Sequence, residues 1–177
     1  MTNEETKKTS TEKINPMREV KIDKVVLNIG ANGEALNKAV TLLNLLTGKT
    51  PAKTTSNKRI PSLGVRPGLE VGAVVTIRKN TEELLKRMLV AVDNQLRKKQ
   101  VSVNNFSFGI HEYIEIPGIE YQREIGIMGL DITIVFKRSG RRVGLRKVKR
   151  GKVSKRQIIS KEEIIKFMEE NFQTQFK

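Results

Sequence analysis

Cysteine is absent from the chain, and only one histidine occurs among its 177 residues. The lack of cysteine excludes disulfides and thiolate ligands, and it fits a reducing cytoplasm. Structural zinc is bound mainly by cysteine and histidine side chains, so this composition leaves little material for a zinc site. We expect neither a metal nor another cofactor.

Long apolar runs are also missing, since none approaches the roughly 18 to 20 residues that a membrane-spanning helix requires. The N-terminal residues MTNEETKKTSTEKINPM are polar and contain no apolar segment of the kind found in secretion signals. We expect residues 1–16 to form a disordered tail and residues 17–177 to form a single domain in the cytoplasm.

Negative charge is scarce, because 34 lysines and arginines stand against 19 aspartates and glutamates, a formal net charge of +15. Such a surplus favours a polyanionic partner, nucleic acid before an anionic membrane surface. Residues 47–66 and residues 137–156, the latter with eleven cations, contain no acidic residue at all. Glycines interrupt the second stretch, which argues against a basic amphipathic helix on a membrane. Both stretches are therefore predicted to follow a phosphate backbone.

Apolar periodicity predicts the elements of an α+β fold. Residues 20–29 and 71–77 have the β-branched composition of strands, and residues 34–46 have the three-and-four spacing of a helix that ends at Gly48. A second helix is predicted to begin at a cap formed by Asn80 or Thr81, with Glu83 in the capping-box position relative to Asn80, and to run through Leu96, followed by the cations at 97–99. Alternating residues from 101 onward predict two or three antiparallel strands, before a last helix begins at Ser160.

This order of elements predicts helices packed on one face of a mainly antiparallel sheet, with the other face open to a ligand. The residues predicted to face the core are Val25, Val26, Leu27, Ile29, Leu36, Ala39, Val40, Leu43, Leu46, Leu84, Leu85, Met88, Leu89, Val92, Leu96, Ile164, Ile165, Phe167 and Met168.

Residues 59–68 are predicted to form an extended arm. Pro61 and Pro67 fix their own φ angles, and Gly64 and Gly68 permit positive φ where the chain turns. The arm is basic and has too few apolar residues to belong to the core.

Two short glycine patterns are weak evidence for nucleotide binding. Gly48-Lys49-Thr50 resembles the end of a phosphate-binding loop, but Leu43 stands where that motif needs a glycine, and the segment closes a helix. A nucleotide-binding enzyme using this segment is kept as the alternative function. Residues 30–33, Gly-Ala-Asn-Gly, are predicted to be a tight turn rather than a dinucleotide site.

The region after residue 110 carries one histidine and an acidic island. His111 is predicted to be a strand histidine satisfied by its neighbours, because the sequence offers it no converging partners. Two interpretations of the acidic island remain open, a solvated edge and a docking patch for a basic protein. Its members are Glu112, Glu115, Glu120 and Glu124.

Five segments resemble one protein family in the family's own order: KVVLNIG, LLTGKTPAKTTSNKRIPSLGVRPG, VGAVVTIR, FGIHEYIEIPGIEY and GIMGLDITIVF. By these segments, residues 16 to about 172 resemble the large-subunit ribosomal protein that binds 5S rRNA, the universal L-five family. The segment FGIHEYIEIPG and the basic run before SKEEIIKF are similar to the archaeal and eukaryotic branch.

The resemblance implies a curved sheet with helices on its convex side, and a structural, non-catalytic role in the central protuberance of the large ribosomal subunit. It implies RNA contacts by Asn28, Lys49, Leu63 and Thr76, although bacterial relatives often have an aromatic residue that can stack where this chain has Leu63. The implied partners are 5S rRNA, 23S-type rRNA, P-site tRNA at the arm, a small-subunit head protein of the S-thirteen family across an intersubunit bridge, and other central-protuberance proteins.

Charge and resemblance together give the predicted site. The residues predicted to bind rRNA are Asn28, Lys49, Lys53, Thr54, Lys58, Leu63, Thr76, Arg78, Arg141, Arg142, Arg146 and Lys147. Those predicted to contact tRNA are Arg59, Ser62, Gly64 and Arg66.

Overall fold

The computed structural model describes residues 15–177. Its strands are β1 (Lys21–Gly30), β2 (Ala52–Thr55), β3 (Glu70–Ile77), β4 (Gln95–Leu96), β5 (Val101–Ser102), β6 (Asn105–Ile110), β7 (Leu130–Lys137) and β8 (Gln175–Phe176). Its α-helices are α1 (Glu34–Thr47), α2 (Thr81–Val90), α3 (Arg142–Leu145) and α4 (Lys161–Phe172). The predicted disordered tail lies outside the described residues except for Asn15 and Pro16, where the Asn15 side-chain oxygen accepts a hydrogen bond from the backbone of Met17 at 3.0 Å.

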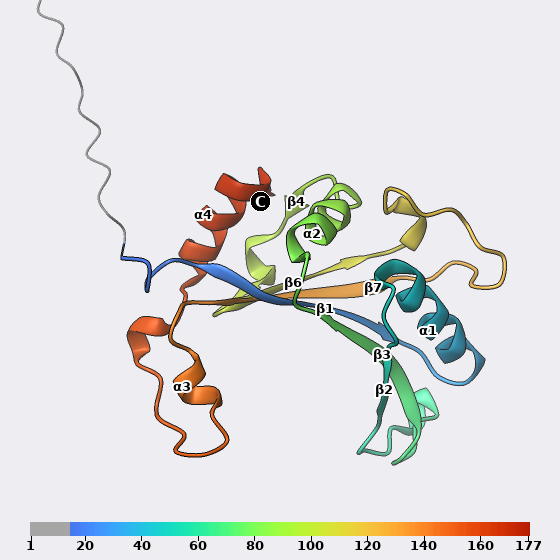
Figure 1. The fold of residues 1–177 in the computed structure, drawn as a ribbon. Helices are drawn as coiled ribbons and strands as arrows, with labels where there is room; N and C mark the ends of the chain where they lie inside the picture. The colour runs from blue at the N-terminus through green and yellow to red at the C-terminus, as the bar shows by residue number, and fades with distance from the viewer. Residues whose placement is uncertain (1–14) are drawn as a thin grey trace, which may run out of the picture.

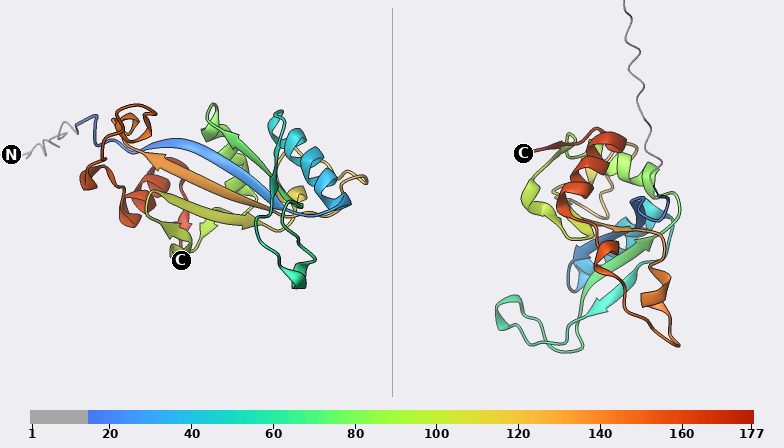
Figure 2. Two further views of the ribbon diagram at one scale, coloured as in Figure 1. Left: turned by 90° about the horizontal axis from the view of Figure 1, so that it is seen from below. Right: turned by 90° about the vertical axis from the view of Figure 1, so that its left-hand side faces the viewer.

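Six strands form one antiparallel sheet in the order β2-β3-β1-β7-β6-β5. Helices α1, α2 and α4 cover one face of the sheet, and the opposite face carries no helix layer (Figure 1). The sheet is twisted and curved along its length (Figure 2). The predicted α+β class and its one-sided helix layer are confirmed.

From Val25 to Ile29 the central strand β1 alternates between the two faces, beyond an irregularity in its pairing with β7 between Ile22 and Lys24. Val25, Leu27 and Ile29 are buried under the helices, whereas Val26 and Asn28 are only partly buried and point to the open face. The prediction that Val26 belongs to the core is therefore wrong. When consecutive residues are all apolar, the sequence does not show which of them face the core and which face outward. The pairing with neighbouring strands and the side that the helices cover decide this.

Helix α1 buries Leu36, Ala39, Leu42, Leu43 and Leu46. The predicted core residue Val40 lies at the margin of this face, and Leu42, which was not predicted, occupies the centre. The helix ends as predicted at Gly48, which has φ 63° and donates its backbone N–H to the Asn44 carbonyl at 2.7 Å.

Helix α2 is shorter than predicted, because Asp93 and Asn94 adopt left-handed φ angles of 52° and 55° that stop it. Leu96 is still buried, but it lies in β4, and Val92 lies in the turn before it. The cations at 97–99 therefore do not end α2. The capping box at Asn80 is also wrong, since that residue has φ 53° and makes no side-chain cap.

The last helix follows its prediction. Ser160 and Glu163 form a reciprocal capping box, with hydrogen bonds of 3.3 and 3.0 Å. Ile164 and Met168 are buried, and Ile165 and Phe167 pack partly buried against the core. Beyond α4, β8 pairs in parallel with β4, so the C-terminal residues lie beside the segment that follows α2.

Strands β5, β6 and β7 are the predicted antiparallel strands after residue 101. Strand β6 ends at Ile110, and His111 is an exposed residue in the bend that follows. The prediction that His111 lies in a strand is therefore wrong. No helix among residues 15–177 is long and apolar enough to cross a membrane.

Candidate nucleic-acid interface

The open face of the sheet carries mostly small or polar side chains. Directly paired residues of antiparallel strands share a face, so the register assigns every side chain on it. Across the sheet from β2 to β5, the residues on this face include Ala52, Thr54, Gly72, Val74, Thr76, Lys24, Val26, Asn28, Asp131, Thr133, Val135, Asn105, Ser107, Gly109 and Ser102.

Three of the predicted RNA contacts gather on this face. Asn28 lies between Val74 of β3 and Asp131 of β7, and Thr76 lies opposite Val26. Gly72 is buried, and a Cβ atom there would lie 2.9 Å from the Thr54 hydroxyl oxygen and 3.9 Å from the Asn28 Oδ1. The missing side chain thus lets the exposed Thr54 pack close over the strand beside Asn28.

Gly72 was not predicted as part of the site. A glycine inside a strand pattern often marks a place where another group approaches the backbone closely, and that signal was present in the sequence. Here the group is the Thr54 hydroxyl.

Lys53 does not join this cluster. It lies opposite Ala73, on the helix side of the sheet, and its Nζ is 2.9 Å from the Glu70 carboxylate. Lys49 is exposed in the turn after α1, where its backbone N–H donates to the Thr47 hydroxyl at 3.2 Å. Because this turn closes a helix instead of opening one, it lacks the N-terminal helix dipole that phosphate-binding loops use.

The basic stretch 47–66 contains a strand that was not predicted, β2, which pairs with β3. The ladder continues past β2 and β3, with the Ser56 N–H donating to the Leu69 carbonyl at 2.9 Å. The arm, residues 59–68, is then closed by an antiparallel bridge between Ile60 and Val65. Lys58, directly before the arm, and Arg78, directly after β3, are both exposed.

The tip of the arm is the single 3-10 turn Pro61–Leu63, followed by Gly64 at φ 65°. Positive φ at Gly64 and Gly68 agrees with the prediction. Leu63 is 65% exposed, whereas Val65 is only 7% exposed. Val65 is therefore buried locally, although it lies outside the main hydrophobic core cluster.

The second projection is the basic loop, residues 138–156, which follows β7. Within the described residues, two of the eleven cations at 137–156 form ion pairs, Lys137 with Asp23 at 2.8 Å and Arg138 with Glu163. The other nine form none in that part of the chain. The predicted surplus of positive charge is therefore mostly uncompensated in the folded protein, including Arg142, Arg146 and Lys147, which are exposed.

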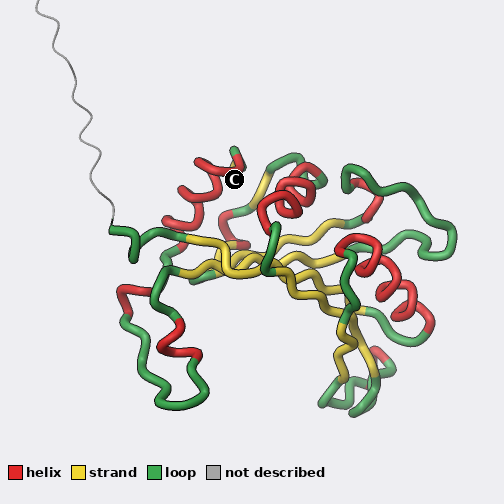
Figure 3. The backbone as a smooth tube through the Cα atoms, in the orientation of Figure 1, coloured by secondary structure: helices red, strands yellow, loops and turns green. Residues whose placement is uncertain are grey.

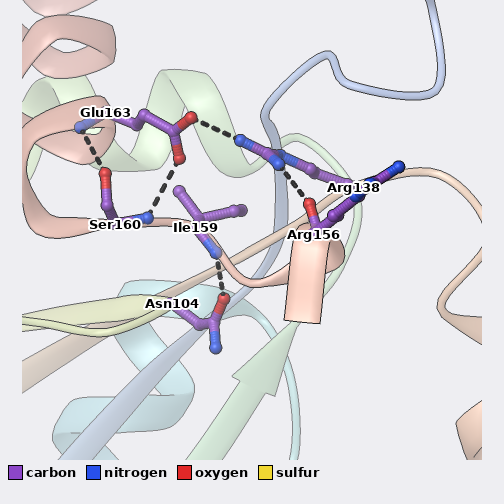
Figure 4. Close-up of polar contacts among 6 residues, drawn as sticks. All are labelled: Asn104, Arg138, Arg156, Ile159, Ser160 and Glu163. Atoms are coloured by element: carbon purple, nitrogen blue, oxygen red, sulfur yellow. Dashed lines mark hydrogen bonds and ion pairs between the residues drawn. The ribbon is translucent and has the colours of Figure 1, made fainter. Parts of the chain in front are cut away.

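A set of side-chain contacts, the clasp, closes the base of the basic loop (Figure 4). The Arg138 guanidinium donates to the Arg156 carbonyl and to the Glu163 carboxylate, so it joins the two ends of the loop and ties them to α4. The second Glu163 oxygen accepts from the backbone of Ser160, and the Asn104 side chain accepts from the Ile159 N–H at 2.8 Å. Arg138 is thus a structural member of the basic stretch.

Both projections point to the side of the sheet that the helices leave open (Figures 1 and 2). Figure 3 shows that most of each is irregular backbone beyond the strand ends. They leave the sheet near opposite ends of β1, whose 10 residues span about 30 Å. The open face is consequently flanked at each end by a basic projection.

The acidic island lies on a loop that is anchored by buried side chains. Tyr113, Ile116 and Ile125 are at most 3% exposed, and the Tyr113 hydroxyl accepts from the Gln122 N–H at 2.9 Å. Arg87 of α2 donates two hydrogen bonds to the Pro117 carbonyl. The four glutamates, Glu112, Glu115, Glu120 and Glu124, are all exposed. In the described part of the chain, no cluster of acidic or histidine side chains is arranged to hold a metal ion.

Two family models match the chain in sequence. One, described as "Ribosomal protein L5", matches residues 15–66, and the other, which describes the C-terminus of the same ribosomal family, matches residues 70–167. Among relatives, the chain is 43% identical to the large ribosomal subunit protein uL5 of Nanoarchaeum equitans over 90% of this chain and 97% of that protein. It is 45% identical to uL5 of Sulfolobus acidocaldarius (90% and 92% covered) and 35% identical to uL5 of Methanobrevibacter smithii (92% and 98% covered).

Proposed function

The chain belongs to the ribosomal L5 family, and from this premise we propose that it binds 5S rRNA in the central protuberance through the open face of its sheet. Members of this family are structural proteins of the large ribosomal subunit that bind rRNA. The proposed action is accordingly binding and positioning in the ribosome, not catalysis.

The observation that carries this proposal is the gathering of Asn28, Thr54 and Thr76 on an uncovered sheet face between two basic projections. Cations such as Lys49 and Arg78 neutralise phosphates and fix the position of the RNA. Amide and hydroxyl groups form directional hydrogen bonds to ribose hydroxyls and base edges, and the ribose 2′-hydroxyl distinguishes RNA from DNA. A sheet face without large apolar side chains lets the nucleic acid approach these polar groups closely.

We further propose that the arm contacts the P-site tRNA through Arg59, Ser62, Gly64 and Arg66. Their place at the tip of a narrow, proline-stiffened projection supports this, because such a projection reaches beyond the surface that holds the 5S rRNA. Leu63 was predicted to bind rRNA, but it lies exposed at this tip among the residues assigned to tRNA, so we propose that it packs on a ribose or base of the tRNA.

The anchored acidic loop supports the docking interpretation of the acidic island. We propose that its four glutamates meet a basic small-subunit head protein of the S-thirteen family across the intersubunit bridge. Its fixed backbone favours this interface, because less conformational entropy is lost on binding. The remaining cations of the basic loop are assigned to 23S-type rRNA near other central-protuberance proteins.

The alternative function, a nucleotide-binding enzyme using Gly48-Lys49-Thr50, gains no support from the position of that segment at the end of α1.

Titration of labelled 5S rRNA with Asn28→Ala and Thr76→Ala variants tests the proposed site. Each variant loses a hydrogen-bonding group worth about 1 kcal/mol, so each is expected to bind about fivefold more weakly with an unchanged melting temperature. Thr41→Ala on α1, an exposed position on the helix-covered side, serves as the matched control and is expected to bind normally. Normal binding by both open-face variants would contradict the proposal.

A further inference from the structure

The basic loop has an ordered interior of its own. The Gly151 N–H donates to the Val143 carbonyl at 3.1 Å, and the Arg150 Nε donates to the Gly144 carbonyl at 2.7 Å. These bonds join the α3 turn to the returning chain, so the loop is held in one shape above the clasp.

Two glycines allow this close packing. A Cβ atom at Gly144 would lie 2.5 Å from the Val153 Cγ2, and one at Gly151 would lie 2.7 Å from the Val143 Cγ1. Both distances are far inside van der Waals contact, so any side chain at either glycine would push the two halves of the loop apart. The two valines can interlock only because both positions are glycine.

A hollow of about 510 Å³ lies between the two halves of the loop. Arg141, Arg150 and Lys152 supply positive charge around it, and Leu145 and Val153 supply apolar surface. Leu145 is 69% exposed and Val148, three residues further on, is 75% exposed, the highest value among the large apolar residues described. Apolar side chains held outward among cations are costly to hydrate and suit a partner that presents both phosphates and flat apolar surface.

We propose that this hollow receives an unstacked nucleotide from a single-stranded segment of RNA, an inference that rests on the rRNA-binding function proposed above. Arg150 and Lys152 face the phosphates, and the base packs against Leu145 and Val153. A duplex fits this surface less well, because its bases are stacked and paired and it offers mainly phosphates and ribose edges. Cations combined with surfaces on which bases lie are typical of single-strand binding.

Fluorescence titration of the full chain with a labelled oligouridine strand and with a short RNA duplex tests the proposal. Leu145→Ser keeps every charge and is expected to weaken oligouridine binding about fivefold, because apolar burial against the base is lost. Its duplex affinity and its salt dependence should stay unchanged. Leu145→Phe is expected to tighten oligouridine binding, because an aromatic ring stacks on a base. Val90→Ser, at a 52% exposed position on α2, is the control and should match the wild type.

Three results would overturn the proposal: unchanged oligouridine binding by both Leu145 variants, an equal loss on strand and duplex, or tighter binding of polyglutamate than of oligouridine. The last would assign the hollow to an acidic protein segment. Measuring 5S rRNA binding by the same preparations separates this inference from the proposed function. Normal 5S binding that still depends on Asn28 would leave that function intact while the hollow is rejected.

Discussion

The two basic projections are built in different ways. The arm prolongs two neighbouring strands, and backbone hydrogen bonds such as those between Ile60 and Val65, at 2.9 and 3.1 Å, hold it together. The basic loop is held at its base by side chains, chiefly Arg138 and Glu163, which come from distant parts of the chain. Both basic segments project on the same side of the sheet (Figure 1), so two projections of similar charge depend on different kinds of support.

Because of this difference, the residues that carry positive charge and those that hold the backbone in place overlap in the basic loop but not in the arm. In the arm, an exposed side chain such as Leu63 can change without loss of the backbone hydrogen bonds. In the basic loop, Arg138 at the base and Arg150 within the loop are themselves part of the support, and replacing either would remove both a charge and a contact. Variants of the two projections therefore need to be chosen so that support and surface are tested apart.

The largest difference is expected in binding to purified large-subunit rRNA. Arg142→Gln with Arg146→Gln removes two uncompensated cations of the basic loop and should weaken binding about tenfold near physiological salt. Arg59→Gln with Arg66→Gln removes the same charge from the arm and should weaken it much less, since the arm is assigned to tRNA. Filter-binding titrations over a range of salt measure both pairs. Equal losses would mean that the projections share one RNA.

A smaller effect is expected on folding stability when the clasp is broken. Glu163→Ala removes the partner of Arg138 and half of the capping box of α4, which should cost about 1 kcal/mol. Glu162→Ala, one residue earlier in the same helical turn, keeps both contacts and is the matched control. Thermal unfolding should show a melting temperature several degrees lower for Glu163→Ala alone. Identical melting curves for the two variants would show that the clasp has no role in stability.

The smallest effect is expected at the tip of the arm. Leu63→Ser leaves the ladder and the buried Val65 in place, so neither stability nor rRNA affinity should change. Retention of peptidyl-tRNA on ribosomes assembled with this variant should nevertheless fall about threefold, since a partly buried apolar contact is lost. Ile127→Ser, at a 69% exposed position on the acidic loop, is the control. If both variants retain tRNA alike, Leu63 makes no tRNA contact.

The sequence predicted those parts that depend on neighbouring residues. The capping box of Ser160 and Glu163 spans three positions, and the glycines of the arm act through their own φ angles, so both were visible in the chain. The clasp was not, because Arg138 and Glu163 are 25 residues apart and Asn104 and Ile159 are 55 apart. Only the fold brings such pairs together.

Two errors have the same origin in tertiary context. Helical periodicity favoured a longer α2, but left-handed Asp93 and Asn94 turn the chain so that Leu96 reaches the core from a strand. Likewise Val26 is apolar yet faces outward, because the core covers one side of β1. The cationic residues of the candidate site were predictable from charge alone, but the helix-side position of Lys53 required the strand register.

The absence of cysteine makes one direct test of the open face possible, since a single introduced thiol can be labelled uniquely. An iron–EDTA group attached to Ala52→Cys would stand on the open face opposite Val74, and one on Thr41→Cys would stand on the helix-covered side. Hydroxyl radicals produced in the complex with 5S rRNA cut the nearby RNA backbone. We predict localised cleavage of 5S rRNA from position 52 and none above background from position 41. Cleavage from position 41 alone would place the RNA on the helices and contradict the open-face interface.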